Sequence, residues 1–116
     1  MALTTLQAAM SGVPFALQTN AATGNGIVLA IPASFRNHNF LLKGGAGIAS
    51  GAVTFETAND PNDAGTWAQI AAPVTAVASA DLMTQFTGIL NFVRARISTN
   101  IVGGTVSVDY TGAKSY

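Results

Sequence analysis

Hydrophobic and polar residues alternate along several short segments of the chain, and turn-forming residues separate these segments. In the segment 52–57, the apolar residues Val53 and Phe55 fall on one side of an extended chain. Their neighbours Thr54 and Glu56 fall on the other side. Similar alternation or short apolar runs occur at 15–19, 27–31, 39–43, 67–70, 92–98 and 105–110. Short strands punctuated by Gly, Asn, Asp and Pro are typical of an all-β domain.

This pattern predicts a single antiparallel β-sandwich of about seven or eight strands over residues 13–116. The apolar run 27–31 has no polar side, so we expect a strand that is buried on both faces. With 116 residues, the chain has the size of one domain.

The segment 80–90 differs from the others because its apolar residues are spaced as on a helix. Leu82, Met83 and Phe86 follow Ser79, a residue type that commonly caps a helix N-terminus. The segment allows at most about three helical turns, and a helix of that length is marginal in isolation. We therefore expect one short helix or a loop near residue 80.

The first twelve residues precede the first convincing strand, and we predict that residues 1–12 form an N-terminal arm. Leu3, Leu6 and Met10 have near-helical spacing, but they are too few to support a helix of their own. Chain termini often become ordered only when a partner holds them. Leu3, Leu6 and Met10 are therefore candidate contacts to a neighbouring molecule.

The chain carries very little charge. Only 9% of its residues are charged and 49% are hydrophobic, and five basic residues balance five acidic ones, whereas an average soluble domain is about 25% charged. A chain without a basic stripe cannot neutralise phosphates, so we expect no nucleic-acid partner. A weakly charged surface favours association, and we predict a symmetric homo-oligomer. An Ala- and Gly-rich composition from a high-GC genome would explain the low charge equally well.

The sequence also predicts no membrane partner. The apolar run 27–31 is far shorter than the roughly 20 residues of a membrane-spanning helix. The N-terminal residues lack the basic start of a signal peptide. The chain has no cysteine, which excludes disulfides and suits folding inside a cell.

The side chains that most enzymes use for catalysis are scarce. His38 is the single histidine, and the chain has no cysteine. A cysteine-based catalytic triad therefore has no nucleophile, and a zinc site lacks its usual ligands. The glycine-rich segment 45–50 ends in Ser50 where a dinucleotide-binding loop requires glycine. We therefore predict no enzymatic activity, no catalytic residues, no cofactor and no metal site. His38 is interpreted as an ordinary turn or interface residue.

The loop 59–65 holds several oxygen ligands, including Asp60 and Asp63. Calcium prefers such ligands, but the spacing departs from a calcium-binding loop at Ala64 and Ala71. Asp and Asn in turns usually cap their own backbone. We predict a structural turn, with weak cation binding at Asp60 and Asp63 as the alternative.

Arg94 and Arg96 are two residues apart on a predicted strand, so they share one face of the sheet. Arginine is enriched at protein interfaces, which makes the pair a candidate contact surface. A solvated face is the alternative. Trp67 lies near Phe55 and Ile70 in the predicted pattern, and we expect it to be a buried anchor of the core.

Taken together, several of these segments resemble small structural proteins of tailed bacteriophages. The resemblance is carried by GAVTFE at 51–56, NDPND at 59–63, WAQI at 67–70, FVRARI at 92–97 and GGTVSV at 103–108. The series is similar to virion decoration proteins and related head or tail proteins, many of which are β-sandwiches or jelly rolls that assemble as trimers. The resemblance covers about half of the chain and does not include its first forty residues.

The resemblance implies a jelly-roll-like sandwich that decorates, or cements, a phage head by binding the major capsid protein. It implies a homotrimer, made in the bacterial cytoplasm and located on the capsid surface of the virion. Arg94 and Arg96 are then candidates for the subunit or capsid contact. The alternative is a carbohydrate- or receptor-binding β-sandwich module of a phage tail fibre or a secreted protein. That alternative predicts exposed aromatic residues in a groove, or a cation at Asp60 and Asp63.

Overall fold

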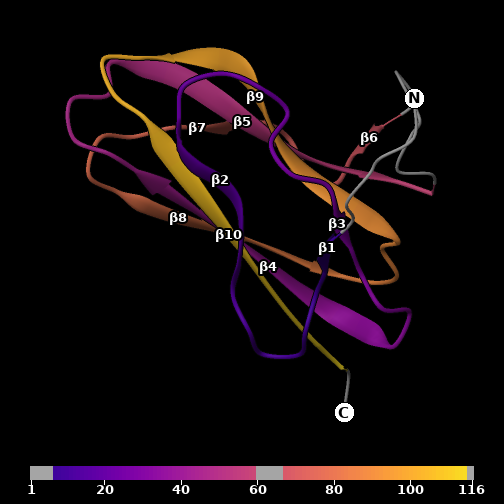
Figure 1. Ribbon diagram of the computed structural model, residues 1–116. Helices are drawn as coiled ribbons and strands as arrows, with labels where there is room; N and C mark the ends of the chain where they lie inside the picture. The colour runs from indigo at the N-terminus through magenta and orange to yellow at the C-terminus, as the bar shows by residue number, and fades with distance from the viewer. Residues whose placement is uncertain (1–6, 60–66, 115–116) are drawn as a thin grey trace.

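The computed structural model describes residues 7–59 and 67–114, which form ten strands and no helix (Figure 1). The predicted all-β class is confirmed. Four of the strands have only two residues. The strands are β1 (Gln7–Ala8), β2 (Phe15–Ala21), β3 (Leu29–Ala30), β4 (Phe35–Gly44), β5 (Ser50–Ala58), β6 (Ala68–Gln69), β7 (Val74–Thr75), β8 (Asp81–Thr87), β9 (Phe92–Val102) and β10 (Val106–Lys114).

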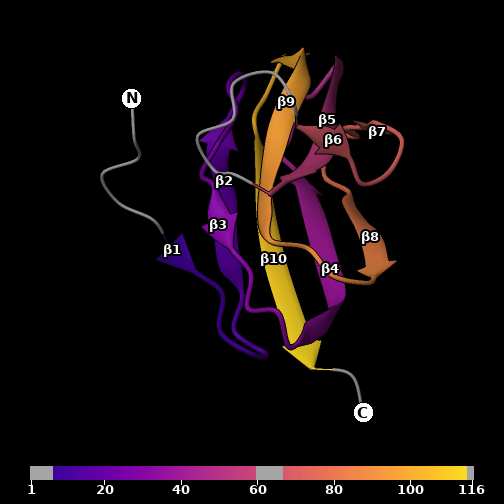
Figure 2. The ribbon, with the colours of Figure 1, turned by 90° about the vertical axis from the view of Figure 1, so that its right-hand side faces the viewer.

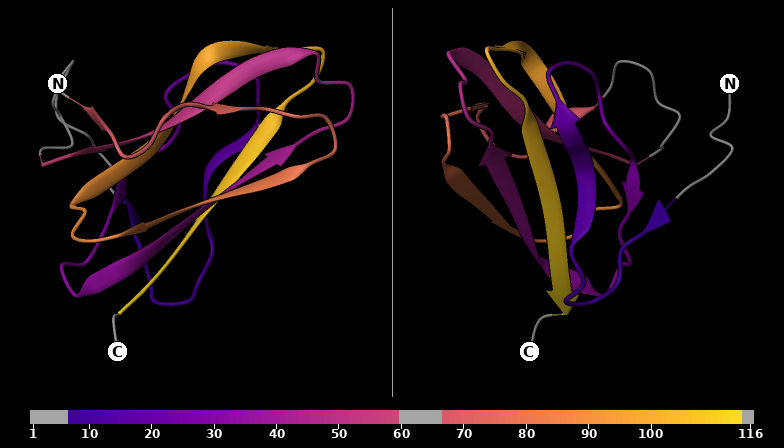
Figure 3. Two further views of the ribbon diagram at one scale, coloured as in Figure 1. Left: turned by 180° about the vertical axis from the view of Figure 1, so that it is seen from behind. Right: turned by 60° about the vertical axis from the view of Figure 1, so that its left-hand side comes forward.

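These strands form two sheets that pack against each other (Figure 2). The first sheet has the order β1-β3-β9-β5-β6, with β7 also paired to β5. The second sheet has the order β2-β10-β4-β8, and β10 lies between β4 and β2 (Figure 3). Every strand pair is antiparallel except β1 with β3. The predicted antiparallel arrangement is therefore confirmed, with one short parallel pair at an edge.

The core lies between the two sheets and is built from the inward-facing residues of their central strands. In β4 and β10, the side chains of Phe40 and Tyr110 are fully buried. The ring of Phe40 stacks on that of Phe55 from β5, with ring centres 4.8 Å apart. Because β4 and β5 belong to different sheets, this aromatic contact joins the two layers.

The predicted alternative of a loop near residue 80 is confirmed for residues 76–80, but a helix over 80–90 is wrong, because residues 81–87 form β8 at an edge of the second sheet. β8 pairs with β4 along its whole length. Leu82 and Phe86 are half-buried against the core, whereas Met83 is 54% exposed. The alternation therefore has a period of two, and pairing with β4 overrides the helix-like spacing of the apolar residues.

The predicted arm, residues 1–12, is joined to the sheets from residue 7 onward. β1 pairs with β3, and the N–H of Ala9 donates a hydrogen bond of 2.8 Å to the carbonyl of Ala30. Ala9 is also part of the buried core. Met10 is 67% exposed. Leu3 and Leu6 lie outside the described residues.

The strand within residues 27–31 is shorter than the apolar run of five residues predicts. Only Leu29 and Ala30 pair, as β3. Leu29 is fully buried, whereas Ile27 is 46% exposed, so the prediction of burial on both faces is wrong for Ile27. An apolar run alone cannot show which of its residues a second layer covers.

Candidate functional site

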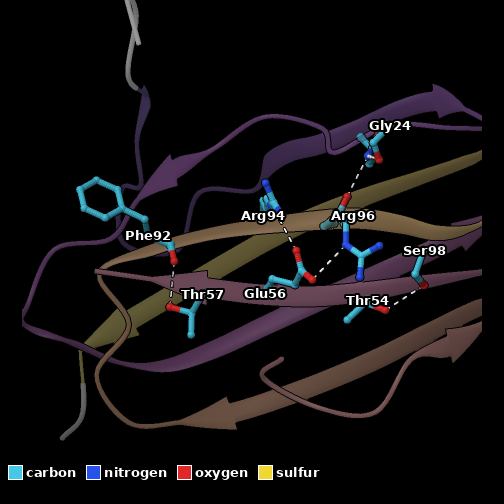
Figure 4. A network of polar contacts seen from close by, with 10 residues as sticks. Gly24, Thr54, Glu56, Thr57, Phe92, Arg94, Arg96 and Ser98 are labelled. Atoms are coloured by element: carbon cyan, nitrogen blue, oxygen red, sulfur yellow. Dashed lines mark hydrogen bonds and ion pairs between the residues drawn. The ribbon is translucent and has the colours of Figure 1, made fainter. Parts of the chain in front are cut away.

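The outer face of the first sheet carries a group of polar residues on its central strands β5 and β9 (Figure 4), with Trp67 beside them. The inward-facing residues of these strands belong to the core, so the residues between them point outward. The structure thus places Arg94 and Arg96 on the same face of β9, and both reach Glu56 of β5. We call this group the outer polar cluster; its members are Thr54, Glu56, Trp67, Arg94, Arg96 and Ser98.

Glu56 lies at the centre of the outer polar cluster. Arg94 Nε donates to Glu56 Oε1 at 2.8 Å, and Arg96 Nε donates to Glu56 Oε2 at 3.0 Å. The Glu56 side chain is only 6% exposed. Burial of a carboxylate costs free energy unless charge and hydrogen bonds compensate it, and the two guanidinium groups supply both. Two arginines and one glutamate leave the cluster with one net positive charge.

Trp67 covers one of these arginines. The guanidinium carbon of Arg94 lies 4.3 Å from the centre of the Trp67 ring, which is the geometry of a cation–π contact. Trp67 is half-buried and lies outside the core, so the prediction of a buried core anchor is wrong. The Arg94 side chain is 16% exposed and that of Arg96 is 35% exposed. Of the two predicted contact residues, Arg96 is therefore the more accessible to a partner.

The other end of the cluster is neutral. Thr54 is fully buried, and its hydroxyl donates to Ser98 Oγ at 2.8 Å. Ser98 Oγ in turn donates to the carbonyl of Ala52 at 3.4 Å. In the described part of the chain, no buried side-chain nitrogen or oxygen lacks a hydrogen-bond partner. The cluster is thus a satisfied polar network rather than a set of free reactive groups.

His38 is a buried residue of β4, and its interpretation as a turn or interface residue is wrong. Its Nδ1 lies 2.6 Å from the Tyr110 hydroxyl, and its Nε2 lies 2.8 Å from the carbonyl oxygen of Gly88. Because a carbonyl can only accept, Nε2 carries the hydrogen and Nδ1 accepts from the Tyr110 hydroxyl. A neutral imidazole therefore links β4, β10 and the end of β8.

Burial lowers the pKa of His38 below its ordinary value of 6.5, and the hydrogen bond to Gly88 partly opposes this shift. As the pH falls below about 6.5, the unfolded chain takes up a proton before the folded chain does, so stability decreases. We expect the free energy of unfolding to fall between pH 7.5 and pH 5.5, by no more than about 1.4 kcal/mol per pH unit. Urea denaturation measures this slope.

The matched variant for this experiment is His38→Gln, which removes the only imidazole in the chain. The slope between pH 6.5 and pH 5.5 should be close to zero in the variant, since other side chains titrate outside this range. Equal slopes in the two proteins would show that His38 does not control the pH dependence.

The outer face of the second sheet is built mainly from neutral polar side chains. Its rows across β8, β4 and β10 include Gln85–Asn39–Thr111 and Thr87–Asn37–Ala113. Lys43 on this face pairs with Asp109, with 2.8 Å between Nζ and Oδ2. The face is therefore broad and almost without net charge.

Residues 7–59 and 67–114 contain no pocket and no group of three or more His, Asp or Glu side chains placed to hold a metal ion. Asp60 and Asp63 lie outside these ranges, so the predicted turn and its alternative cation site are not described. The same ranges contain no helix with the length and apolar character to cross a membrane. No family model, curated protein or solved structure matches the chain.

Proposed function

We propose that this protein is a non-enzymatic structural protein of a bacteriophage virion, and specifically a decoration protein that binds the major capsid protein on the surface of the head. The observation that carries the proposal is how the chain uses its few charges. Glu56 is paired with two arginines, and Lys43 is paired with Asp109. The outer face of the first sheet therefore keeps a single net positive charge and that of the second sheet is almost neutral, which suits binding over an extended surface by shape and polar contacts.

The resemblance of segments 51–56, 92–97 and 103–108 to phage decoration proteins supports the same function. By that resemblance, the sandwich is jelly-roll-like and the protein assembles as a trimer. It is made in the cytoplasm of the bacterial host and is located on the capsid surface of the virion. Its partners are the major capsid protein and further copies of itself.

A carbohydrate- or receptor-binding module is the alternative function. It requires an aromatic ring that is free to stack on a ligand. One face of Trp67 is instead occupied by the guanidinium of Arg94. A sugar can then stack only on the opposite face of this ring, so Trp67 offers less of the platform that the alternative requires.

Particles released from cells that carry the gene test the proposal directly. A decoration protein should copurify with the particles in a constant ratio to the major capsid protein, and antibody labelling should place it on the head. Deletion of the gene should make the heads less resistant to heat. Labelling of the tail fibres, together with binding to a glycan array, would instead support the receptor-binding alternative.

Arg96 is the arginine that we expect to contact the capsid, because it is the more exposed of the pair. Arg96→Ala should weaken attachment to heads about tenfold, which corresponds to about 1.4 kcal/mol for an interface arginine. The Arg94–Glu56 pair remains, so the fold should persist. Binding to heads that lack the protein, measured by cosedimentation, gives the affinity.

Arg36→Ala is the matched control, since Arg36 is an exposed arginine of β4 on the other sheet. It should attach as tightly as the wild-type protein. An equal loss in both variants would mean that attachment depends on total charge and not on the outer polar cluster. Met10, exposed near the N-terminus, and Leu3 and Leu6 remain further candidate contacts.

A further inference from the structure

Strand β8 has one side without a strand partner. It forms the end of the second sheet and pairs with β4 alone (Figure 2). Within the described ranges, no main-chain hydrogen bond joins the other side of Asp81–Thr87 to another segment. An edge of this kind presents a row of N–H and carbonyl groups to which another strand can add.

The direction of these groups follows from the pairing with β4. The N–H of Gly44 donates to the carbonyl of Ala80, and the N–H of Gly88 donates to the carbonyl of Arg36, each at 2.8 Å. Hydrogen-bonded positions in an antiparallel pair alternate with a period of two, so the even-numbered residues of β8 bond to β4. The odd-numbered residues, Asp81, Met83, Gln85 and Thr87, therefore direct their N–H and carbonyl groups to the open side.

β8 also lacks the features that usually protect an edge strand. Lysine, proline and bulges are common protections. β8 contains no lysine or proline, and its register with β4 has no shift. The opposite edge of the same sheet differs, because β2 has register shifts and the carbonyl of Leu17 accepts a hydrogen bond from Ile27. The open edge of β8 is thus the more suitable of the two for a further strand.

We propose that the open edge of β8 binds β8 of a second copy of this chain, antiparallel about a two-fold axis that passes beside Thr84. This register places Asp81 opposite Thr87, Met83 opposite Gln85, Leu82 opposite Phe86, and Thr84 opposite its own copy. No like charges face each other in any row. The outward N–H groups of one copy meet the outward carbonyls of the other, because the same odd-numbered residues face the edge in both.

Three exposed apolar residues lie on β8 or in the loops at its two ends. Val77, Met83 and Ile89 are 49%, 54% and 56% exposed, and they lie within or next to β8. Leu82 and Phe86 are half-buried and would gain cover from each other across the two-fold axis. The chain has a net charge of zero, so two copies approach without long-range repulsion. These features favour a second copy over a charged or unrelated partner.

The proposed contact between two β8 strands is small, and its two-fold symmetry limits the assembly to two copies. Pairing of one strand buries less than the roughly 1,200 Å² of a standard stable interface, so the dimer should dissociate on dilution. A two-fold contact joins each copy to one other and gives a dimer, whereas the resemblance to decoration proteins implies a trimer. The dimer therefore disagrees with the implied trimer, but it does not bear on the proposed binding to the major capsid protein.

Sedimentation velocity over a wide range of protein concentration tests the contact. We expect the wild-type protein to shift from one chain of 11.8 kDa to a dimer as its concentration rises. Met83→Lys should raise the dissociation constant about tenfold or more, because the two lysines become diagonal neighbours across the axis while Asp81 of the other copy lies farther away, opposite Thr87. Thr19→Lys adds the same charge to an exposed position of β2 at the opposite edge, and it should dimerise like the wild type.

A protein that stays monomeric at the highest concentration, or a trimer, would overturn the inference. So would a dimer that Met83→Lys and Thr19→Lys weaken equally. These measurements use the purified chain alone. Their failure leaves the proposed binding to capsids untouched, and failure of capsid binding leaves the dimer untouched.

Single cysteines test the register, since the chain has none of its own. In the proposed pairing, Thr84 lies opposite its copy at a non-hydrogen-bonded position, where Cα atoms are about 4.5 Å apart, within reach of a disulfide. Thr84→Cys should therefore form a covalent dimer quickly under mild oxidation. Thr87→Cys, which lies opposite Asp81, should form it much more slowly. Equal rates would exclude the register centred on Thr84.

Discussion

Phe40→Ala is expected to lower the free energy of unfolding by about 3–5 kcal/mol. Phe40 is fully buried, and its ring stacks on Phe55 at 4.8 Å and meets the edge of Tyr110 at 5.3 Å between ring centres. Phe55 belongs to the first sheet and the other two rings to the second. Truncation removes the contact between the layers and leaves a cavity that the strands cannot fill.

Urea denaturation measures this loss, and Val102→Ala is a suitable control because Val102 is 54% exposed. The control should change stability by no more than about 0.5 kcal/mol. Since domains of this kind are stable by only about 5–15 kcal/mol, Phe40→Ala should remove a large share of the total. A loss of less than about 1 kcal/mol would show that packing of the two sheets does not depend on this aromatic contact.

Glu56→Gln is expected to destabilise the protein by about 2–4 kcal/mol. The Glu56 side chain is 6% exposed and accepts hydrogen bonds from both Arg94 and Arg96. Glutamine keeps the size of the side chain but removes its charge, so two guanidinium groups remain close together without an anion. The exposure of Arg96 reduces the effect below that of a fully buried ion pair, because water screens its charge.

Asp109→Asn provides the matched control, since it removes the charge of the carboxylate that pairs with Lys43. The side chains of Lys43 and Asp109 are 46% and 26% exposed, so their pair should contribute at most about 1 kcal/mol. Added salt should weaken the Lys43–Asp109 pair more than the Glu56 pairs. If Asp109→Asn and Glu56→Gln cost the same free energy, the outer polar cluster has no special role in the fold.

The sequence by itself determined the all-β class and the faces of the main strands. Val53 and Phe55 of β5 point into the core as their alternation predicts, and Arg94 and Arg96 share the outer face of β9. This information is local, because side chains alternate along any extended backbone. A period of two in the sequence therefore shows which residues lie on a common face, before any partner strand is known.

Only the tertiary structure decided which strands lie side by side and what covers each face. The apolar spacing of 81–87 suits a helix as well as a strand, and pairing with β4 selected the strand. Glu56 is buried on the outer face because Arg94 and Arg96 of β9 lie across it. His38 is buried with its polar atoms satisfied because Tyr110, 72 residues away along the chain, supplies a hydrogen bond from the neighbouring strand of the same sheet. These contacts join residues far apart in the chain, and the local pattern of a segment carries no signal of the segment that will pack against it.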